Sequence, residues 1–116
     1  MSNPILGDQV RGHLETMILS VLVKGGDTHG FDIVKRLEAA GEGALQLKEG
    51  TIYPVLYRLE AAGLIKARWE AASSERRGPR RKLYQVTKKG HRQLEAAREQ
   101  WQSFVTIVGA IVGGAI

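Results

Sequence analysis

Residues 49–87 constrain the fold most, because a helical pattern is followed there by two strand patterns around a basic loop. Apolar residues within 50–63 recur at three- and four-residue spacing, which predicts one buried face on a helix. Residues 65–70 alternate apolar and charged side chains, and a returning strand is expected over 83–87, after the turn signal Gly78-Pro79. The buried face of the helix is expected to consist of Ile52, Val55, Leu56 and Leu59.

Pro54 fixes where this helix begins. Proline has no backbone N–H and is tolerated only in the first turn, so the helix begins between Glu49 and Thr51. Gly63 is expected to end it. The side chains left for the outer face are those of Thr51, Tyr53, Pro54, Tyr57 and Arg58.

Two further helices are expected before this segment. The first extends from about Asp8 to Val23, with an apolar stripe that includes Val10 and is widened by Leu19, and glycines end it. The second is expected to be capped by Asp27 or Thr28. Asp32 then lies in its first turn, where the helix dipole favours an anion. The core side of this second helix is expected to carry Phe31, Val34, Leu37 and Ala40.

The last helix is expected to follow an N-cap at Thr87, and it carries a heptad pattern. Apolar residues recur every seven positions in two sets offset by three, which together form a seam. Such a seam needs a partner, either the first helix of the same chain or the same helix of a second subunit. We expect a dimer interface rather than a membrane anchor, because the apolar end from Phe104 to Ile116 is shorter than the roughly 20 residues that a span needs. The expected interface residues are Leu94, Ala97, Trp101, Phe104 and Val108.

Trp101 supports two interpretations. As a seam residue it is most simply part of the core at a dimer contact. Alternatively, two copies related by a twofold axis could form a flat aromatic slot for a planar ligand.

Positive charge is concentrated in one part of the chain. The formal net charge is +5, and eight of the 17 Lys/Arg lie between Arg76 and Arg92, where there is no Asp or Glu. The rest of the chain therefore carries nine Lys/Arg against 12 Asp/Glu, a balance of −3. A localised basic segment is typical of a protein that binds a polyanion. A merely solvated charge run is the alternative, but the alternating apolar positions in the same region argue against it.

Nothing in the sequence predicts an enzyme. His13, His29 and His91 lack metal-ligand spacing, and there is no nucleophile elbow and no Walker loop, so we expect no metal and no cofactor. The absence of cysteine excludes disulfides and is compatible with a reducing cytoplasm. The N-terminus lacks the pattern of a secretory signal, so a cytoplasmic protein without membrane contact is expected.

The element order helix, helix, helix, strand, loop, strand, helix predicts a winged helix-turn-helix, a mainly α fold with a small β-hairpin wing. We expect a DNA-binding domain over 8–87 and a C-terminal dimerisation helix over 88–116. In such folds the helix over 50–62 enters the major groove, and the hairpin flanks the duplex. The expected DNA-binding residues are Thr51, Tyr53, Pro54, Tyr57 and Arg58 on the helix, with Arg76, Arg77, Arg80, Arg81 and Lys82 on the wing.

Two details leave alternatives open. Tyr53 and Tyr57 could instead pack against neighbouring residues. Lys88 and Lys89 lie in the first turn of a helix, where the dipole disfavours cations, so they either meet a phosphate or form a solvated turn.

These segments resemble the PadR family of transcriptional regulators, from about Arg11 to Trp101. The most specific similarity is Gly50-Thr51-Ile52-Tyr53-Pro54-Val55-Leu56-Tyr57-Arg58-Leu59-Glu60-Ala61-Ala62-Gly63-Leu64-Ile65, which is similar to the family's recognition-helix motif. An earlier segment that includes His29-Gly30-Phe31-Asp32-Ile33 and a later one, Gly78-Pro79-Arg80-Arg81-Lys82-Leu83-Tyr84, are similar to its opening and wing motifs.

The resemblance implies a homodimer formed through the C-terminal helix and a pseudo-palindromic operator on double-stranded DNA. It also implies a repressor released by a small aromatic or hydrophobic effector, with Trp101 in the place of a tryptophan that lines a central pore in some members. Leu83, Lys88-Lys89 and the apolar, glycine-rich end depart from the family pattern. Two other functions remain open, namely a protein-interaction module and a nucleic-acid-binding protein without sequence preference.

Overall fold

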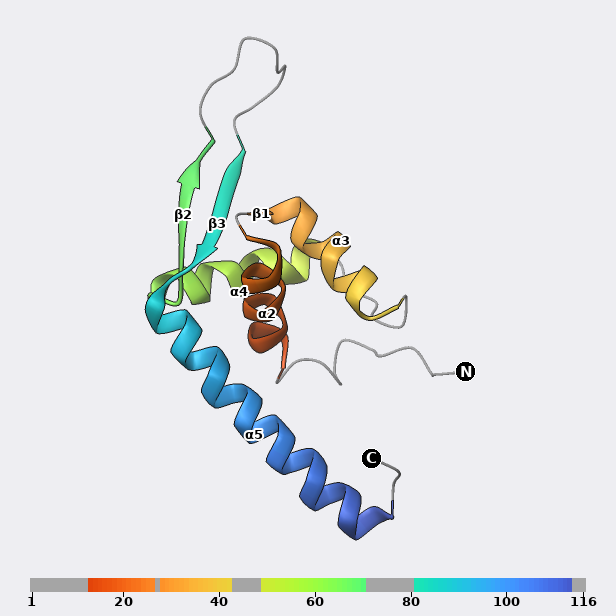
Figure 1. The fold of residues 1–116 in the computed structure, drawn as a ribbon. Coiled ribbons are helices and arrows are strands. Elements are labelled where there is room, and N and C mark those ends of the chain that lie inside the picture. The colour runs from red at the N-terminus through yellow and green to blue at the C-terminus, as the bar shows by residue number, and fades with distance from the viewer. Residues whose placement is uncertain (1–12, 27, 43–48, 71–80, 114–116) are drawn as a thin grey trace.

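The described part of the chain contains four helices and a small antiparallel sheet (Figure 1). A computed structural model describes residues 13–26, 28–42, 49–70 and 81–113. The predicted class, mainly α with a small β-hairpin, is confirmed. The elements are α2 (Leu14–Gly25), β1 (Thr28–His29), α3 (Gly30–Ala40), α4 (Glu49–Ala61), β2 (Ile65–Trp69), β3 (Lys82–Val86) and α5 (Lys88–Val112).

The helix starts and ends follow the sequence signals in most places. α4 begins at Glu49, within the predicted range, but Pro54 is its sixth residue and lies inside the helix, so its predicted place in the first turn was wrong. Gly63 adopts a φ of 76°, a conformation that favours glycine after a helix end. α2 ends at Gly25, two residues beyond the predicted end. The predicted start of α2 at Asp8, with Val10, lies outside the described residues.

The sheet has the strand order β1-β3-β2, and both pairs are antiparallel. β1 was not predicted. It pairs with β3, with Thr28 opposite Tyr84, and this pairing places the start of α3 beside the hairpin.

The predicted capping role of Thr28 was wrong, because Thr28 belongs to β1. His29 is the N-cap of α3, and the Thr28 hydroxyl donates to the Gly26 carbonyl at 2.8 Å while it accepts from Arg36 at 2.7 Å. Asp27, the alternative cap, lies outside the described residues.

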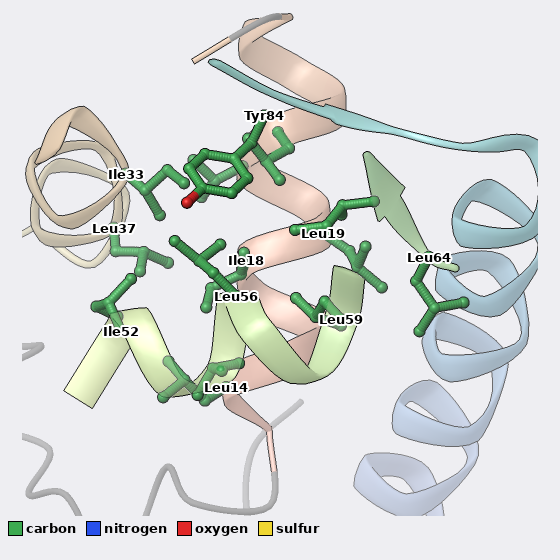
Figure 2. Packing of buried hydrophobic residues seen from close by; sticks show 14 of the residues in the cluster. Leu14, Ile18, Leu19, Ile33, Leu37, Ile52, Leu56, Leu59, Leu64 and Tyr84 are labelled. Carbon is green, nitrogen blue, oxygen red and sulfur yellow. The ribbon is translucent and has the colours of Figure 1, made fainter. Parts of the chain in front are cut away.

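The core lies where α2, α3, α4 and the hairpin meet. Figure 2 shows side chains of these helices pointing toward one another beside the ring of Tyr84. Leu19 is buried as expected.

Phe31 and Ala40 of α3 are exposed, so their predicted core positions were wrong. The buried stripe of α3 runs through Gly30, Ile33, Val34 and Leu37, and Phe31 lies about a quarter of a turn away from it. The Lys35 ammonium covers the Phe31 ring at 4.5 Å instead.

A junction joins the start of α5 to the turn after α4; we define it as Ala62–Leu64 with Thr87–Gly90. The Thr87 hydroxyl donates to the Gly63 carbonyl at 2.6 Å and accepts from the Gly90 N–H at 3.1 Å, which confirms Thr87 as the N-cap. The Thr87 N–H donates to the Leu64 carbonyl at 3.1 Å. A Cβ atom added at Gly90 would lie 2.1 Å from that same carbonyl oxygen, so the two segments are in close contact.

α5 is the longest described helix, about 37 Å at 1.5 Å per residue. Its first half packs against α2, and its second half extends away from the rest of the molecule (Figure 1). Among the described residues, no helix combines the length and the apolar character that a membrane span requires.

Candidate nucleic-acid interface

α4 is amphipathic in the way the sequence predicts. Its stripe of Ile52, Val55, Leu56 and Leu59 is buried, and Figure 2 shows Ile52, Leu56 and Leu59 directed into the core. The opposite face is therefore open to solvent. The five predicted residues of this face, Thr51, Tyr53, Pro54, Tyr57 and Arg58, are all exposed.

The two tyrosines of this face have different surroundings. A Cβ added at Gly30 would lie 3.0 Å from a ring carbon of Tyr53, so this ring packs over the start of α3. Tyr57 is 73% exposed, against 40% for Tyr53. The packing alternative therefore applies to Tyr53, while Tyr57 is the tyrosine that can reach a base or a phosphate.

Arg58 has a partner that the sequence did not indicate. Its Nε lies 3.5 Å from Glu15 Oε1 of α2, and both side chains are more than half exposed. Exposed ion pairs contribute about 0–1 kcal/mol, so this contact orients the guanidinium without withdrawing it from a ligand. Arg58 thus remains available on the outer face of α4.

The wing is described only at its base. Arg76, Arg77 and Arg80 lie outside the described residues. Arg81 is exposed, and its carbonyl accepts from the Glu70 N–H at 2.7 Å, which extends the β2–β3 pairing. Lys82 differs from Arg81, because its side chain is only 33% exposed and lies 3.7 Å from Glu60 of α4.

Lys89 has a role that was not among the two expected for the Lys88–Lys89 pair. Its ammonium donates to the Ala62 carbonyl at 2.7 Å, at the C-terminal end of α4, where the helix dipole favours a cation. Lys88 is exposed. The contact of Lys89 joins residues 27 positions apart, so no local pattern could have indicated it.

A cleft of about 310 Å³ opens between the start of α3, Tyr53 and the base of the wing. In it the His29 ring lies between two carboxylates, 3.6 Å from Asp32 and 3.2 Å from Glu70. Burial, and then the nearby charge of Glu60, raise the pKa of Tyr84 above its usual value. Within the described part of the chain, no cluster of His, Cys, Asp or Glu could hold a metal ion. The cleft is lined by His29, Gly30, Phe31, Asp32, Tyr53, Arg81, Lys82 and Tyr84.

The seam of α5 divides into two parts. Leu94 is 1% exposed and belongs to the core of its own chain, so its predicted place in a dimer interface was wrong. Trp101 and Phe104 are about half exposed, and their rings stack with centroids 5.8 Å apart. The His13 ring packs edge-on against Trp101, with a distance of 5.1 Å between ring centroids. Ala97 is half-buried. Beyond Phe104 the exposed apolar surface continues through Ile107, Val108, Ile111 and Val112.

Comparison with known proteins agrees with this arrangement. The model of the transcriptional regulator PadR-like family matches residues 18–96. A transcriptional regulator from Clostridium thermocellum has a similar structure, with a TM-score of 0.81 and 30% identity over 93% of this chain and 98% of its own. A PadR-like transcriptional regulator from Bacillus cereus is 31% identical over 94% of this chain and all of its own, with a TM-score of 0.77.

A longer relative matches over part of its length. The transcriptional regulator YqjI of Escherichia coli is 33% identical over 89 residues, which are 77% of this chain and 39% of YqjI. The family model, the winged-helix architecture and the exposed face of α4 all lead to the same assignment. This chain belongs to the PadR-like family of transcriptional regulators.

Proposed function

We propose that this PadR-like regulator is a homodimeric, sequence-specific repressor that binds a pseudo-palindromic operator. The observation that carries the proposal is the outer face of α4, where Tyr57 and Arg58 are exposed beside the base of a basic wing. α4 is then the recognition helix and lies in the major groove. The wing supplies phosphate contacts and most of the affinity, and α4 supplies base contacts and specificity.

The second half of α5 supports the dimer. Trp101, Phe104, Val108 and Ile111 recur at heptad spacing on a helix that extends away from its own core, and all four are exposed. Contiguous apolar surface of this kind marks an interaction site. A second copy of the same helix is the natural partner, because a twofold axis presents one seam to the other. The two recognition helices would then lie about 34–36 Å apart, in successive major grooves.

Release by a small aromatic or hydrophobic effector is part of the proposal. Trp101 supports it, since its ring lies in the exposed seam, where two copies would approach each other. In a Trp69→Phe background, a planar aromatic compound is expected to quench the Trp101 emission and to weaken operator binding together. A compound series that changes neither signal would assign Trp101 to the dimer core alone.

Arg58→Ala is expected to weaken operator binding by about 1–3 kcal/mol if Arg58 reads a base. Glu15→Gln removes the orienting partner and is expected to have a smaller effect in the same direction. Fluorescence anisotropy with operator and scrambled duplexes checks both variants. An equal loss on both duplexes would make Arg58 a phosphate contact instead.

The proposed function is tested by anisotropy of a labelled duplex from the gene's own upstream region, against a scrambled duplex, at two salt concentrations. A repressor of this kind is expected to prefer the native duplex and to keep that preference at the higher salt concentration. Equal binding to both duplexes that collapses with salt would favour a nucleic-acid-binding protein without sequence preference. No binding to either duplex would favour a protein-interaction module.

A further inference from the structure

Lys82 lies at the base of the wing, and its ammonium is surrounded by groups from three different elements. Its Nζ is 3.7 Å from Oε1 of Glu60. It is also 5.9–6.0 Å from the centroids of three aromatic rings, which is within the range of a cation–π interaction. These rings belong to Tyr57 of α4, Trp69 of β2 and Tyr84 of β3.

The backbone accounts for this arrangement. Lys82 pairs with Trp69 across β2 and β3, so both side chains lie on one face of the sheet. Tyr84 follows two residues later on the same face. Tyr57 and Glu60 are three residues apart in α4 and therefore share a helix face. We call Lys82, Glu60 and the three aromatic residues the wing-root cluster.

We propose that Lys82 is a positioning residue, whose ammonium holds the base of the wing against the recognition helix and sets the orientation in which both meet the DNA. This role replaces the phosphate contact predicted for Lys82, and it rests on the DNA binding that is part of the proposed function. Glu60 supports the assignment, since a carboxylate 3.7 Å from the ammonium would repel a phosphate approaching the same group. Tyr57 belongs both to the cluster and to the exposed face of α4, so the cluster also orients a residue that faces the ligand.

Two variants of the cluster and one control separate positioning from phosphate contact. Lys82→Met removes the charge and keeps most of the side-chain length, and Glu60→Gln removes the carboxylate while the ammonium stays. Lys66→Met is the matched control. Lys66 is an exposed lysine of β2 that lies three residues before Trp69, so it is on the face of the sheet opposite to the wing-root cluster. Lys82→Arg keeps the charge and is the conservative variant.

The full-length variants are titrated with operator and scrambled duplexes over a range of salt concentrations, after thermal unfolding has shown that each is folded. Positioning predicts that Lys82→Met and Glu60→Gln both weaken operator binding by about two- to fivefold, a size typical of exposed cation–π and ion-pair contacts. Binding to the scrambled duplex and the salt slope stay near those of wild type, and Lys82→Arg recovers most of the loss. Lys66→Met keeps the wild-type ratio of operator to scrambled affinity.

The emission of Trp69 in a Trp101→Phe background provides a readout without DNA. Lys82→Met and Glu60→Gln are expected to change it in the free protein, because both disturb the groups around this ring, and Lys66→Met is not. Unchanged emission in both cluster variants would overturn the proposal.

Phosphate contact predicts a different set of results. Lys82→Met would then weaken binding to both duplexes equally and lower the salt slope by about 0.9, and Glu60→Gln would tighten binding. These results would overturn the positioning role and leave the proposed function intact. If the wild type shows no preference for the operator, the proposed function fails, and the Lys82 assignment is judged on the scrambled duplex. On that duplex, Lys82→Met with an unchanged salt slope and altered Trp69 emission would support the positioning role of Lys82. A lowered salt slope would overturn it.

Discussion

A Phe104→Asp variant is expected to be monomeric and to bind the operator at least about a hundredfold more weakly than the wild type. Phe104 is 56% exposed in its own chain, so the substitution leaves the protomer core intact. In a dimer it would place two carboxylates in an apolar seam, where an unpaired charge is costly. A monomer would contact one half-site of the operator instead of two. Binding through two linked sites typically raises affinity by about 10²–10⁴-fold, and the variant would lose this gain.

Thr106→Asp is the matched control for this variant. Thr106 is exposed on the same helix, two residues farther along and on the side away from the seam, and it gains the same charge. Sedimentation equilibrium gives the oligomeric state, and anisotropy gives the affinity. A Phe104→Asp protein that remains dimeric with wild-type affinity would rule out the proposed seam.

Gly90→Ala is expected to lower the free energy of unfolding by about 3 kcal/mol, at the upper end of the usual cost of overpacking. The new Cβ would lie 2.1 Å from the Leu64 carbonyl oxygen and 2.7 Å from Cγ1 of Val86. The oxygen belongs to the backbone and also accepts from the Thr87 N–H, so it cannot move aside without breaking that hydrogen bond. Urea unfolding followed by circular dichroism measures the change.

Gly50→Ala provides the comparison, because Gly50 is also helical and a Cβ there meets no atom within 4 Å. Alanine at an open helical position is expected to stabilise the protein by up to about 1 kcal/mol. Equal effects at both glycines would show that helix propensity, rather than the contact with Leu64, governs position 90.

Local patterns in the sequence predict much of this fold. The three- and four-residue spacing of Ile52, Val55, Leu56 and Leu59 correctly separates the buried and exposed faces of α4. Thr87 correctly marks the start of α5, whereas Pro54 lies inside α4 and not in its first turn. These signals succeed because each depends on a few neighbouring residues. The exposed part of the candidate interface follows directly from them, although the DNA contacts themselves remain a prediction.

The features that sequence patterns missed depend on distant residues. β1 has only two residues, so it shows no alternation, and it exists because Thr28 and His29 pair with β3. Leu94 fits the heptad pattern, but the pattern alone cannot show whether the same chain or a second subunit buries this residue. The structure shows that Leu94 is buried in the core of its own chain. The contacts of Lys82 and Lys89 reach residues on other elements, so their roles follow from the fold alone.

The junction between α4 and α5 has a mechanical consequence. Because Thr87, Lys89 and Gly90 attach the start of α5 to the turn after α4, we expect the two helices to turn together as a lever. Phe104 lies 14 residues beyond Gly90, roughly 21 Å along the helix axis. A tilt of about 10° at that distance displaces the far end of the lever by roughly 4 Å, close to the spacing of one base pair. In a dimer joined through α5, a small change in helix crossing angle would therefore move the recognition helices out of register with successive major grooves, with no rearrangement inside either winged-helix body.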